Sequence, residues 1–350
     1  MSQASSTQPT ASPKINWRQA VAGYQNPSLR RSYFEIATSI LPYFALLSLM
    51  FLSLEISYWL TLALAFPTAG FLVRIFIIFH DCGHGSFFKS NRLNDFWGYV
   101  TGIITFTPYH YWRRSHAIHH ATVSNLDRRG VGDVMTLTVK EYLALSPWGK
   151  LKYRIYRNPL IMLLVGPTLL FLVGHRFASK GAGQRERHSV IWTNLALLVI
   201  YLILIPTLGL KTYLMVHLPV LFIAFTVGVW LFYVQHQFED TYWENQENWD
   251  FVSASLKGSS FYKLPKLLQW FTGNIGFHHI HHLSPRIPNY LLEKCQNEND
   301  LFKDIKSLTL LSSLKCLRFR LWDEDRRILV GFAALRRLTG EGAVSRPNST

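Results

Sequence analysis

Charged residues and cysteines are both scarce in this chain. Only 16% of its 350 residues are Asp, Glu, Lys or Arg, while 49% are hydrophobic, a composition that argues against an ordinary soluble domain and favours the membrane class. The three cysteines, Cys82, Cys295 and Cys316, are odd in number and far apart. We therefore expect neither a disulfide framework nor a thiolate metal site, which fits a reducing cytoplasmic setting.

Other absences set the expected domain organisation. The first residues, MSQASSTQPTASPK, have no apolar core beside them, so we expect a polar tail over 1–34 rather than a cleaved signal peptide. A second tail is expected over 321–350, leaving one membrane domain over 35–320. There is no internal repeat and no recognisable nucleic-acid-binding module. Nucleic acid is therefore not an expected partner.

Long apolar stretches predict the fold class. Four of them approach the ~20 residues that cross a bilayer: residues 38–56, 58–79, 190–208 and 214–235. A fifth stretch, 159–174, is shorter and carries an internal Gly-Pro, so we expect it to lie at the interface or re-enter rather than span. The sequence thus predicts an all-α membrane protein with four transmembrane helices and a helical cap at one end.

The distribution of positive charge predicts the orientation. The formal net charge is +15. Lys and Arg fall almost entirely before residue 32, within 85–188 and after 256. The two connections on the other side, near residue 57 and over 209–213, hold only Lys211. By the positive-inside rule we expect a multi-pass protein with both termini and the cap on the cytoplasmic side. This basic face suits anionic headgroups and an acidic partner protein.

Histidines carry the main chemical signal. Of the fourteen present, most gather in three short motifs, HDCGH, HAIHH and HHIHH, and one more ends the last apolar stretch. The predicted metal ligands are His80, His84, His116, His119, His120, His236, His278, His281 and His282. Spacings of i, i+3 and i+4 place the members of each motif on one helical face. His279 points about 100° away from His278, and His110 lies off the face of the second motif, so neither is expected to bind metal.

The number of imidazoles indicates two metal ions. A metal of the zinc type takes three or four protein ligands, so eight or nine histidines supply two ions with about four each. Imidazole suits zinc, copper, iron and nickel, so the residue type alone does not choose between them. Nearby polar groups are candidates to accept a hydrogen bond from the second ring nitrogen of a ligand: Asp81, Asp127, Asp133, Glu239, Asp240 and Asn274. Asn274 is expected to share a helical face with His278.

Topology must bring the motifs to one side of the membrane. The first two motifs precede the third and fourth apolar stretches, whereas His236 and the third motif follow them. Only an even number of crossings between the two sets allows them to share a metal pair. The metal hypothesis therefore requires the four-span arrangement that charge independently favours.

These motifs resemble the three histidine boxes, HxxxH, HxxHH and HxxHH, of the integral-membrane fatty acid desaturases. The surrounding residues are also similar to the bacterial and cyanobacterial acyl-lipid branch, nearest the omega-6 (delta-12) type. The stretches that carry this similarity, over roughly residues 35 to 300, are GFLVRIFIIFHDCGHGSFF, PYHYWRRSHAIHHATVSNLD, FYVQHQFEDTYW and GNIGFHHIHHLSPRIPNY.

The resemblance implies a non-haem di-iron centre that uses O₂ and two electrons to place a cis double bond in an acyl chain. By carry-over the box histidines are the iron ligands, His236 is the extra one, and no catalytic residue is expected beyond them. The expected substrate is a lipid-linked oleoyl chain, converted to linoleoyl. No haem-binding domain is fused to the chain, so the resemblance implies an external electron donor, a ferredoxin or a b-type cytochrome.

Two other readings stay open. A di-iron membrane hydroxylase, a carotenoid ketolase or hydroxylase, or another desaturase would carry similar boxes, and product analysis separates them. A histidine-rich metal transporter belongs to a different class and would hold its ligands near the bilayer midplane. Here the histidines stand at or beyond the ends of the apolar stretches.

Overall fold

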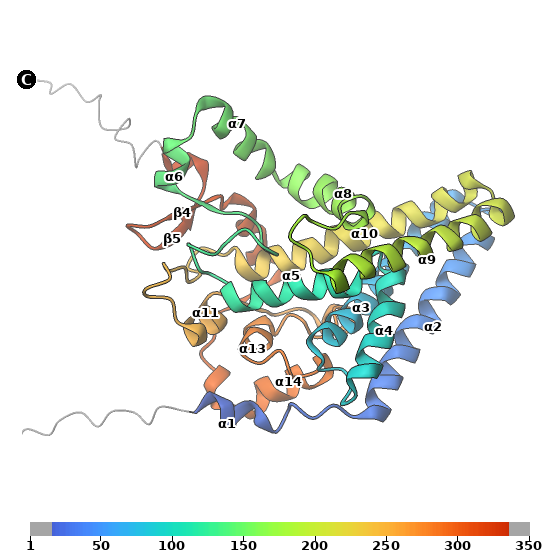
Figure 1. The fold of residues 1–350 in the computed structure, drawn as a ribbon, viewed down its shortest axis with the longest axis horizontal. Coiled ribbons are helices and arrows are strands. Elements are labelled where there is room, and N and C mark those ends of the chain that lie inside the picture. Colours follow the sequence, from blue (N-terminus) through green and yellow to red (C-terminus); the bar gives the residue numbers. More distant parts are fainter. Residues whose placement is uncertain (1–15, 336–350) are drawn as a thin grey trace, which may run out of the picture.

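The computed structural model describes residues 16–335 of the chain, and it is largely helical (Figure 1). Within that range four helices are long and apolar enough to cross a membrane: α2 (Leu29–Ser53), α3 (Tyr58–His84), α9 (Gln184–Leu208) and α10 (Leu210–His236). Each has 25 or 27 residues, more than the ~20 that a bilayer core requires. The predicted all-α fold with four candidate spans is confirmed.

Glycines and a cap set the ends of these helices. Ser28 caps α2 by accepting a hydrogen bond from the Arg31 amide. Gly85, with φ 68°, takes the left-handed conformation that ends α3 directly after His84, a conformation that costs glycine little. Gly209, with φ 78°, makes the tight connection between α9 and α10. Because α3 ends at Gly85, the first histidine motif occupies its last turn.

Helix α3 lies at the centre of the bundle and packs against α2 and α10. The main apolar core forms along this contact and includes Leu72, Ile75, Val216 and Val220. Arg74, inside α3, faces the interior rather than lipid. Its guanidinium pairs with Glu35 of α2 and stacks 4.1 Å from the centre of the Trp270 ring, so the buried charge is compensated.

Most of the other elements form a cap around the histidine-bearing ends of the spans (Figure 1). Two helices instead pack along the spans, α4 (Asn91–Ile104) on α3 and α8 (Gly166–Leu172) on α10. The helices of the cap are α1 (Trp17–Ala22), α5 (Tyr109–Thr122), α6 (Val139–Ala144), α7 (Pro147–Tyr156), α11 (Phe251–Lys257), α12 (Lys266–Phe271), α13 (His278–Leu283), α14 (Asn289–Glu298) and α15 (Leu310–Ser313). Shorter π and 3-10 turns are η1 (Ile161–Val165), η2 (Gly174–Arg176), η3 (Asp300–Phe302), η4 (Leu314–Arg318) and η5 (Phe332–Ala334).

Two small sheets fasten the C-terminal part of the chain to the cap. The first has the order β1-β4-β5, with β1 (Leu137–Thr138) parallel to β4 (Leu321–Asp323) and β4 antiparallel to β5 (Ile328–Val330). The second pairs β2 (Phe261–Tyr262) in parallel with β3 (Ser307–Leu308). Leu137 lies opposite Leu321, and Phe261 opposite Ser307.

The fifth apolar stretch is bent. Helix α7 and the following segment, Ile161–Arg176, meet at 57° across a short break, an arrangement of a broken span or a re-entrant loop. The bent pair and its break expose large apolar side chains, among them Trp148 and Ile155 of α7 and Leu160 at the break. Pro159 and Pro167 interrupt regular helix here. This geometry agrees with a segment that does not cross straight through, and its position relative to the bilayer stays a prediction.

The described fold extends on both sides of the predicted 35–320 domain. Helix α1 and the start of α2 precede residue 35, and Val21 in α1 is fully buried. Strands β4 and β5 follow residue 320, with Leu321 and Trp322 buried. The predicted tails therefore contain packed segments, because a few apolar residues suffice to dock a short element on the cap. The remainder of both tails, 1–15 and 336–350, lies outside the described residues.

Candidate metal centre

Nine imidazoles from four separate elements converge at the C-terminal ends of α3 and α10. The first group contains His80, His84, His116, His120 and His281, and the second contains His119, His236 and His282. Within each group the candidate ligand atoms all lie within 4.8 Å of one another. His278 joins the second group, since its Nε2 lies 3.0 Å from Nε2 of His236 and 3.1 Å from Nε2 of His282. All nine predicted ligands are thus brought together.

Helix α5 runs between the two groups and supplies both. His116 and His120, one turn apart, place their Nε2 atoms 3.1 Å from each other on the side of the first group. His119 faces the second group, with Nε2 3.2 Å from that of His236. The rings of His120 and His282 stack with centroids 4.1 Å apart. The groups are therefore direct neighbours.

The chemistry of this donor set fits metal ions. Nε2 atoms approach each other at 3.0 to 3.2 Å, and each neutral imidazole has only one donor and one acceptor. Several buried Nδ1 atoms have no partner among residues 16–335: those of His119, His120, His278, His281 and His282. The Nε2 atom of His236, for example, faces two other Nε2 atoms but can make only one hydrogen bond, and a cation between the rings would satisfy the whole set.

Burial keeps these rings in the form that binds metal. Loss of solvent around the ring lowers the pKa of His116, His120 and His281 well below 6.5, and the neighbouring imidazoles lower it further. The pKa of His119 falls for the same reasons. A histidine must be neutral to coordinate a metal, so no proton has to be displaced near neutral pH.

Two groups outside the ligand set orient rings. Asp81 Oδ1 lies 3.1 Å from Nδ1 of His80, and its Oδ2 accepts a hydrogen bond of 2.7 Å from the Asn289 amide. His236 Nδ1 lies 3.2 Å from the Gly258 carbonyl. When Nδ1 donates a hydrogen bond, Nε2 carries no proton and its lone pair can bind a metal ion. The same bond fixes the plane of the ring. The contact predicted for Asp81 is present.

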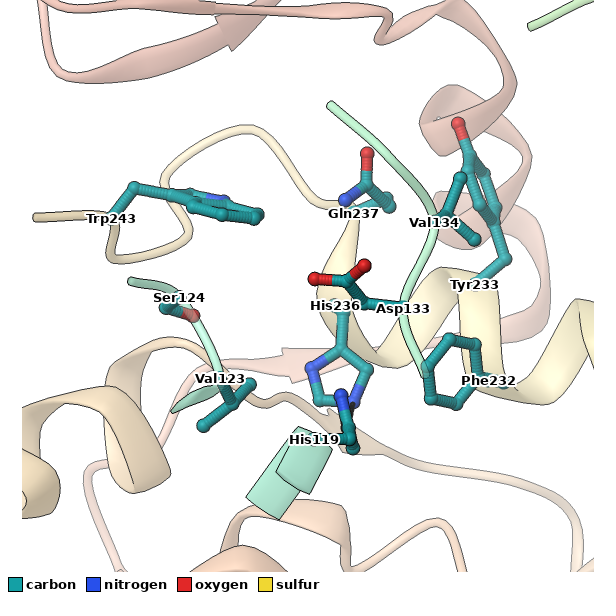
Figure 2. Close-up of a pocket in the computed structure, with 10 residues that line it drawn as sticks. All are labelled: His119, Val123, Ser124, Asp133, Val134, Phe232, Tyr233, His236, Gln237 and Trp243. Atoms are coloured by element: carbon teal, nitrogen blue, oxygen red, sulfur yellow. Dashed lines mark hydrogen bonds between the residues drawn. The ribbon is translucent and has the colours of Figure 1, made fainter. Parts of the chain in front are cut away.

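Asp133 lies beside the second group in a small cavity. The cavity measures about 10 Å³, roughly what one water molecule needs, and His119, His236 and Trp243 contribute to its lining. Figure 2 shows the Asp133 carboxylate pointing into it beside His236. Burial raises the pKa of Asp133 to about 6, although the Gly130 amide donates to its Oδ1 at 2.8 Å.

The structure does not bring the other four polar candidates to the imidazoles. Asp127 accepts a hydrogen bond from the Gln246 amide. Glu239 and Asp240 are exposed, and Asp240 pairs with Lys306, because α10 ends at His236 and the chain turns outward. The predicted shared face of Asn274 and His278 is wrong. Helix α13 begins only at His278, and Asn274 precedes it with φ 57°.

The two histidines expected to be bystanders point elsewhere. His279 Nε2 lies 2.9 Å from the Gln296 side-chain oxygen, and His110 accepts from the Arg185 guanidinium at 3.2 Å. Sequence reasoning missed Trp112, which stacks on His116 with centroids 4.3 Å apart. Its position one turn before His116 was the available signal. The Gly258 carbonyl and Asn289 amide gave no such signal, because every residue carries these groups.

Comparisons with known proteins agree with this site. A family model described as fatty acid desaturase matches residues 57–304. The chain is 51% identical over 318 residues to a fatty acid desaturase of Bacillus subtilis, covering 91% of this chain and 90% of the relative. It is 30% identical over 243 residues to an sn-1 oleoyl-lipid 12-desaturase of Picosynechococcus, covering 68% of each. An sn-1 acyl-lipid omega-3 desaturase (ferredoxin) of Nostoc is 28% identical over 232 residues, covering 63% of this chain and 62% of the relative.

Proposed function

This chain belongs to the fatty acid desaturase family, and on that premise we propose that it converts lipid-linked oleoyl chains to linoleoyl chains. The observation that carries the proposal is the pair of buried histidine groups at the C-terminal ends of α3 and α10, two of the four apolar helices. The 12-position is supported by relatives named as oleoyl-lipid 12-desaturases, at 30% identity or less.

The nine histidines would hold two iron ions, five at one site and four at the other. Bound there, the iron pair supplies the O₂-dependent oxidation that removes two hydrogens from adjacent methylenes. The protein contributes neutral, buried imidazoles. Asp81 and the Gly258 carbonyl fix the rings of His80 and His236, so that little reorganisation is needed when the ions bind.

The placement of the centre suits a membrane substrate. His80 and His84 end α3, and His236 ends α10, so the centre stands where two apolar helices leave the bundle core. An acyl chain reaches it from the bilayer, while burial of the rings excludes bulk water. The connection 54–57 contains no Lys or Arg, which supports the proposal that the cap and both termini face the cytoplasm.

Electrons come from an external carrier in this proposal. A ferredoxin is favoured over a b-type cytochrome because the Nostoc relative is named as ferredoxin-dependent. Small electron carriers are commonly acidic, and the net charge of +15 gives the chain a complementary surface.

Fatty acid profiling tests this function. The chain is expressed in a host rich in monounsaturated lipid, with the His84→Ala variant as the inactive match. We expect new diunsaturated chains, chiefly linoleoyl, only with the unmodified chain. An unchanged profile together with confirmed iron loading would contradict the substrate, and hydroxylated acyl chains would indicate a hydroxylase instead.

A further inference from the structure

Arg157 is fully buried without a carboxylate. It caps the C-terminus of α7, where the chain bends toward α8, and its exposed fraction is 0%. In the part of the chain that the structure describes, no Asp or Glu lies within ion-pair distance of it. Elsewhere the buried Arg74 has Glu35. A buried cation without a countercharge is costly, so its surroundings must hold it firmly.

The guanidinium is held by neutral oxygens from three other segments. Its shortest hydrogen bond is to the Gln237 side-chain oxygen at 2.8 Å. It also donates to the Thr136 hydroxyl, and to the carbonyls of Met135 and Phe319, all at 3.3 Å. The Tyr233 ring covers it at 5.8 Å. The fixed fork of an arginine serves several acceptors at once, which a lysine cannot do.

These contacts lead directly to the second histidine group. Gln237 follows His236, the last residue of α10, and its side chain lines the cavity that His119 and His236 share (Figure 2). The Thr136 hydroxyl donates to the same Gln237 oxygen at 3.2 Å. Thr136 closely follows Asp133, which lines the same cavity. Arg157 therefore joins the end of α10 to the segment that passes across the cavity.

We propose that Arg157 is a positioning residue for the second histidine group, acting through Gln237. By tethering Gln237 it sets the last turn of α10, and with it the place of His236 relative to His119 and His278. Because Ile155, Tyr156 and Leu160 around the bend are exposed, the same tether links an outward-facing apolar segment to the centre. The inference rests on the proposed metal-binding function of these histidines.

The test compares Arg157 with Arg154, one turn earlier on α7. Arg154 donates to the Tyr142 hydroxyl at 2.7 Å and lies 4.9 Å from the centre of the Phe332 ring. It thus fastens α7 to other parts of the cap, without a contact to α10. Arg157→Gln, Arg157→Lys and Arg154→Gln are prepared as full-length protein. Iron per chain, Co²⁺ titration followed by absorption, thermal midpoint, and kcat and KM are measured for each.

For Arg157→Gln we expect affinity at one of the two metal sites to fall about tenfold or more, with the other site unchanged and kcat lowered more than KM rises. Arg157→Lys should recover part of the loss. Arg154→Gln should bind metal as the unmodified protein does, even where its thermal midpoint drops equally. If Arg157→Gln does not fold, Gln237→Ala removes the tether from the other side and should weaken the same site.

Two results would overturn the proposal. One is Arg157→Gln binding two irons with unmodified affinity, whatever its thermal midpoint. The other is an equal loss of metal in Arg154→Gln, which would show a general loosening of α7. Failure of the unmodified protein to bind iron would instead overturn the proposed function, and this inference with it.

Discussion

The two histidine groups share helices but differ in what lies beside them. Helices α5 and α13 contribute rings to both, while α3 serves only the first and α10 only the second. The first group has a carboxylate bonded to a ring, Asp81 on His80. The second has a backbone carbonyl, that of Gly258, and a cavity with the carboxylate of Asp133. The rings of the two groups are therefore oriented by chemically different partners.

The largest effect should come from removing one ligand in either group. His84→Ala and His236→Ala should each lower desaturation more than 100-fold, because each deletes a ligand from a site of five or four. Iron content should fall by at least one ion per chain in both. The measurements are the fatty acid profile and elemental analysis of the purified variants.

His279→Ala is the matched control for the third motif. This ring is as buried as its neighbours but bonds Gln296, so its loss should cost about 1 to 3 kcal/mol of stability and leave iron nearly unchanged. His278→Ala should instead lower the iron content and leave the stability nearly unchanged. A variant pair in which His279→Ala loses iron and His278→Ala keeps it would refute the assignment of α13.

Asp81→Asn should affect one group alone. The amide no longer supports His80 as a strong acceptor, so iron affinity at the first site should fall about 10- to 100-fold, while the second site keeps its affinity. Asp95→Asn, which removes the ion pairs to Arg113 and Arg185, is the control. Competitive chelator titration separates the two sites. Equal weakening of both sites would show that the groups are not distinct in this respect.

How far the sequence predicted this site depends on the residue. Helical spacing predicted the convergence of the box histidines that the structure shows, and topology predicted that His236 would join them. Spacing did not show that α5 divides its histidines, with His119 turned to the second group and His116 and His120 to the first. A single face of a helix is wide enough to meet two neighbouring ions, so the face alone does not assign a ring to one of them.

The polar groups that bond the imidazole rings were harder to predict. Asp81 directly follows His80, the ring that it contacts. The prediction for Asn274 was wrong because helix α13 starts after this residue. Where a helix begins depends on packing as much as on local sequence. The four spans followed from apolar length. The docking of Leu321 and Trp322 could not be predicted from apolar length, because it depends on the pairing of β4 with a distant strand, β1.

Asp133→Asn should stabilise the metal-free protein. The carboxyl has its ordinary pKa of 3.8 in the unfolded chain and about 6 in the folded one, so the folded state favours the protonated form. The protonated Asp133 carboxyl therefore stabilises the folded state fully below pH 3.8, and this stabilisation is lost as the pH rises through 6. Above pH 7 the uncharged variant should gain up to about 3 kcal/mol, and near pH 4 the gain should vanish. The prediction is checked by measuring the thermal midpoints of the unmodified protein and of Asp133→Asn near pH 4 and above pH 7.

The smallest effect concerns the electron donor. Arg114 is exposed on α5, where it pairs with Glu186 and donates to the Gly181 carbonyl, and we expect it to contact an acidic carrier. Arg114→Gln should slow ferredoxin-dependent turnover about two- to fivefold at low salt, and the difference should shrink as the Debye length falls below ~10 Å. Lys140→Gln on α6 is the matched control. Turnover that is indifferent to salt in all three proteins would contradict electrostatic docking at this surface.

Iron content of the purified full-length chain tests the central claim most directly. We predict two non-haem irons per chain, measured by elemental analysis with Mössbauer spectroscopy, and loss of at least one in His236→Ala with retention of both in His279→Ala. A stoichiometry of one, or two irons that persist in His236→Ala, would contradict a centre built from the five-histidine and four-histidine groups.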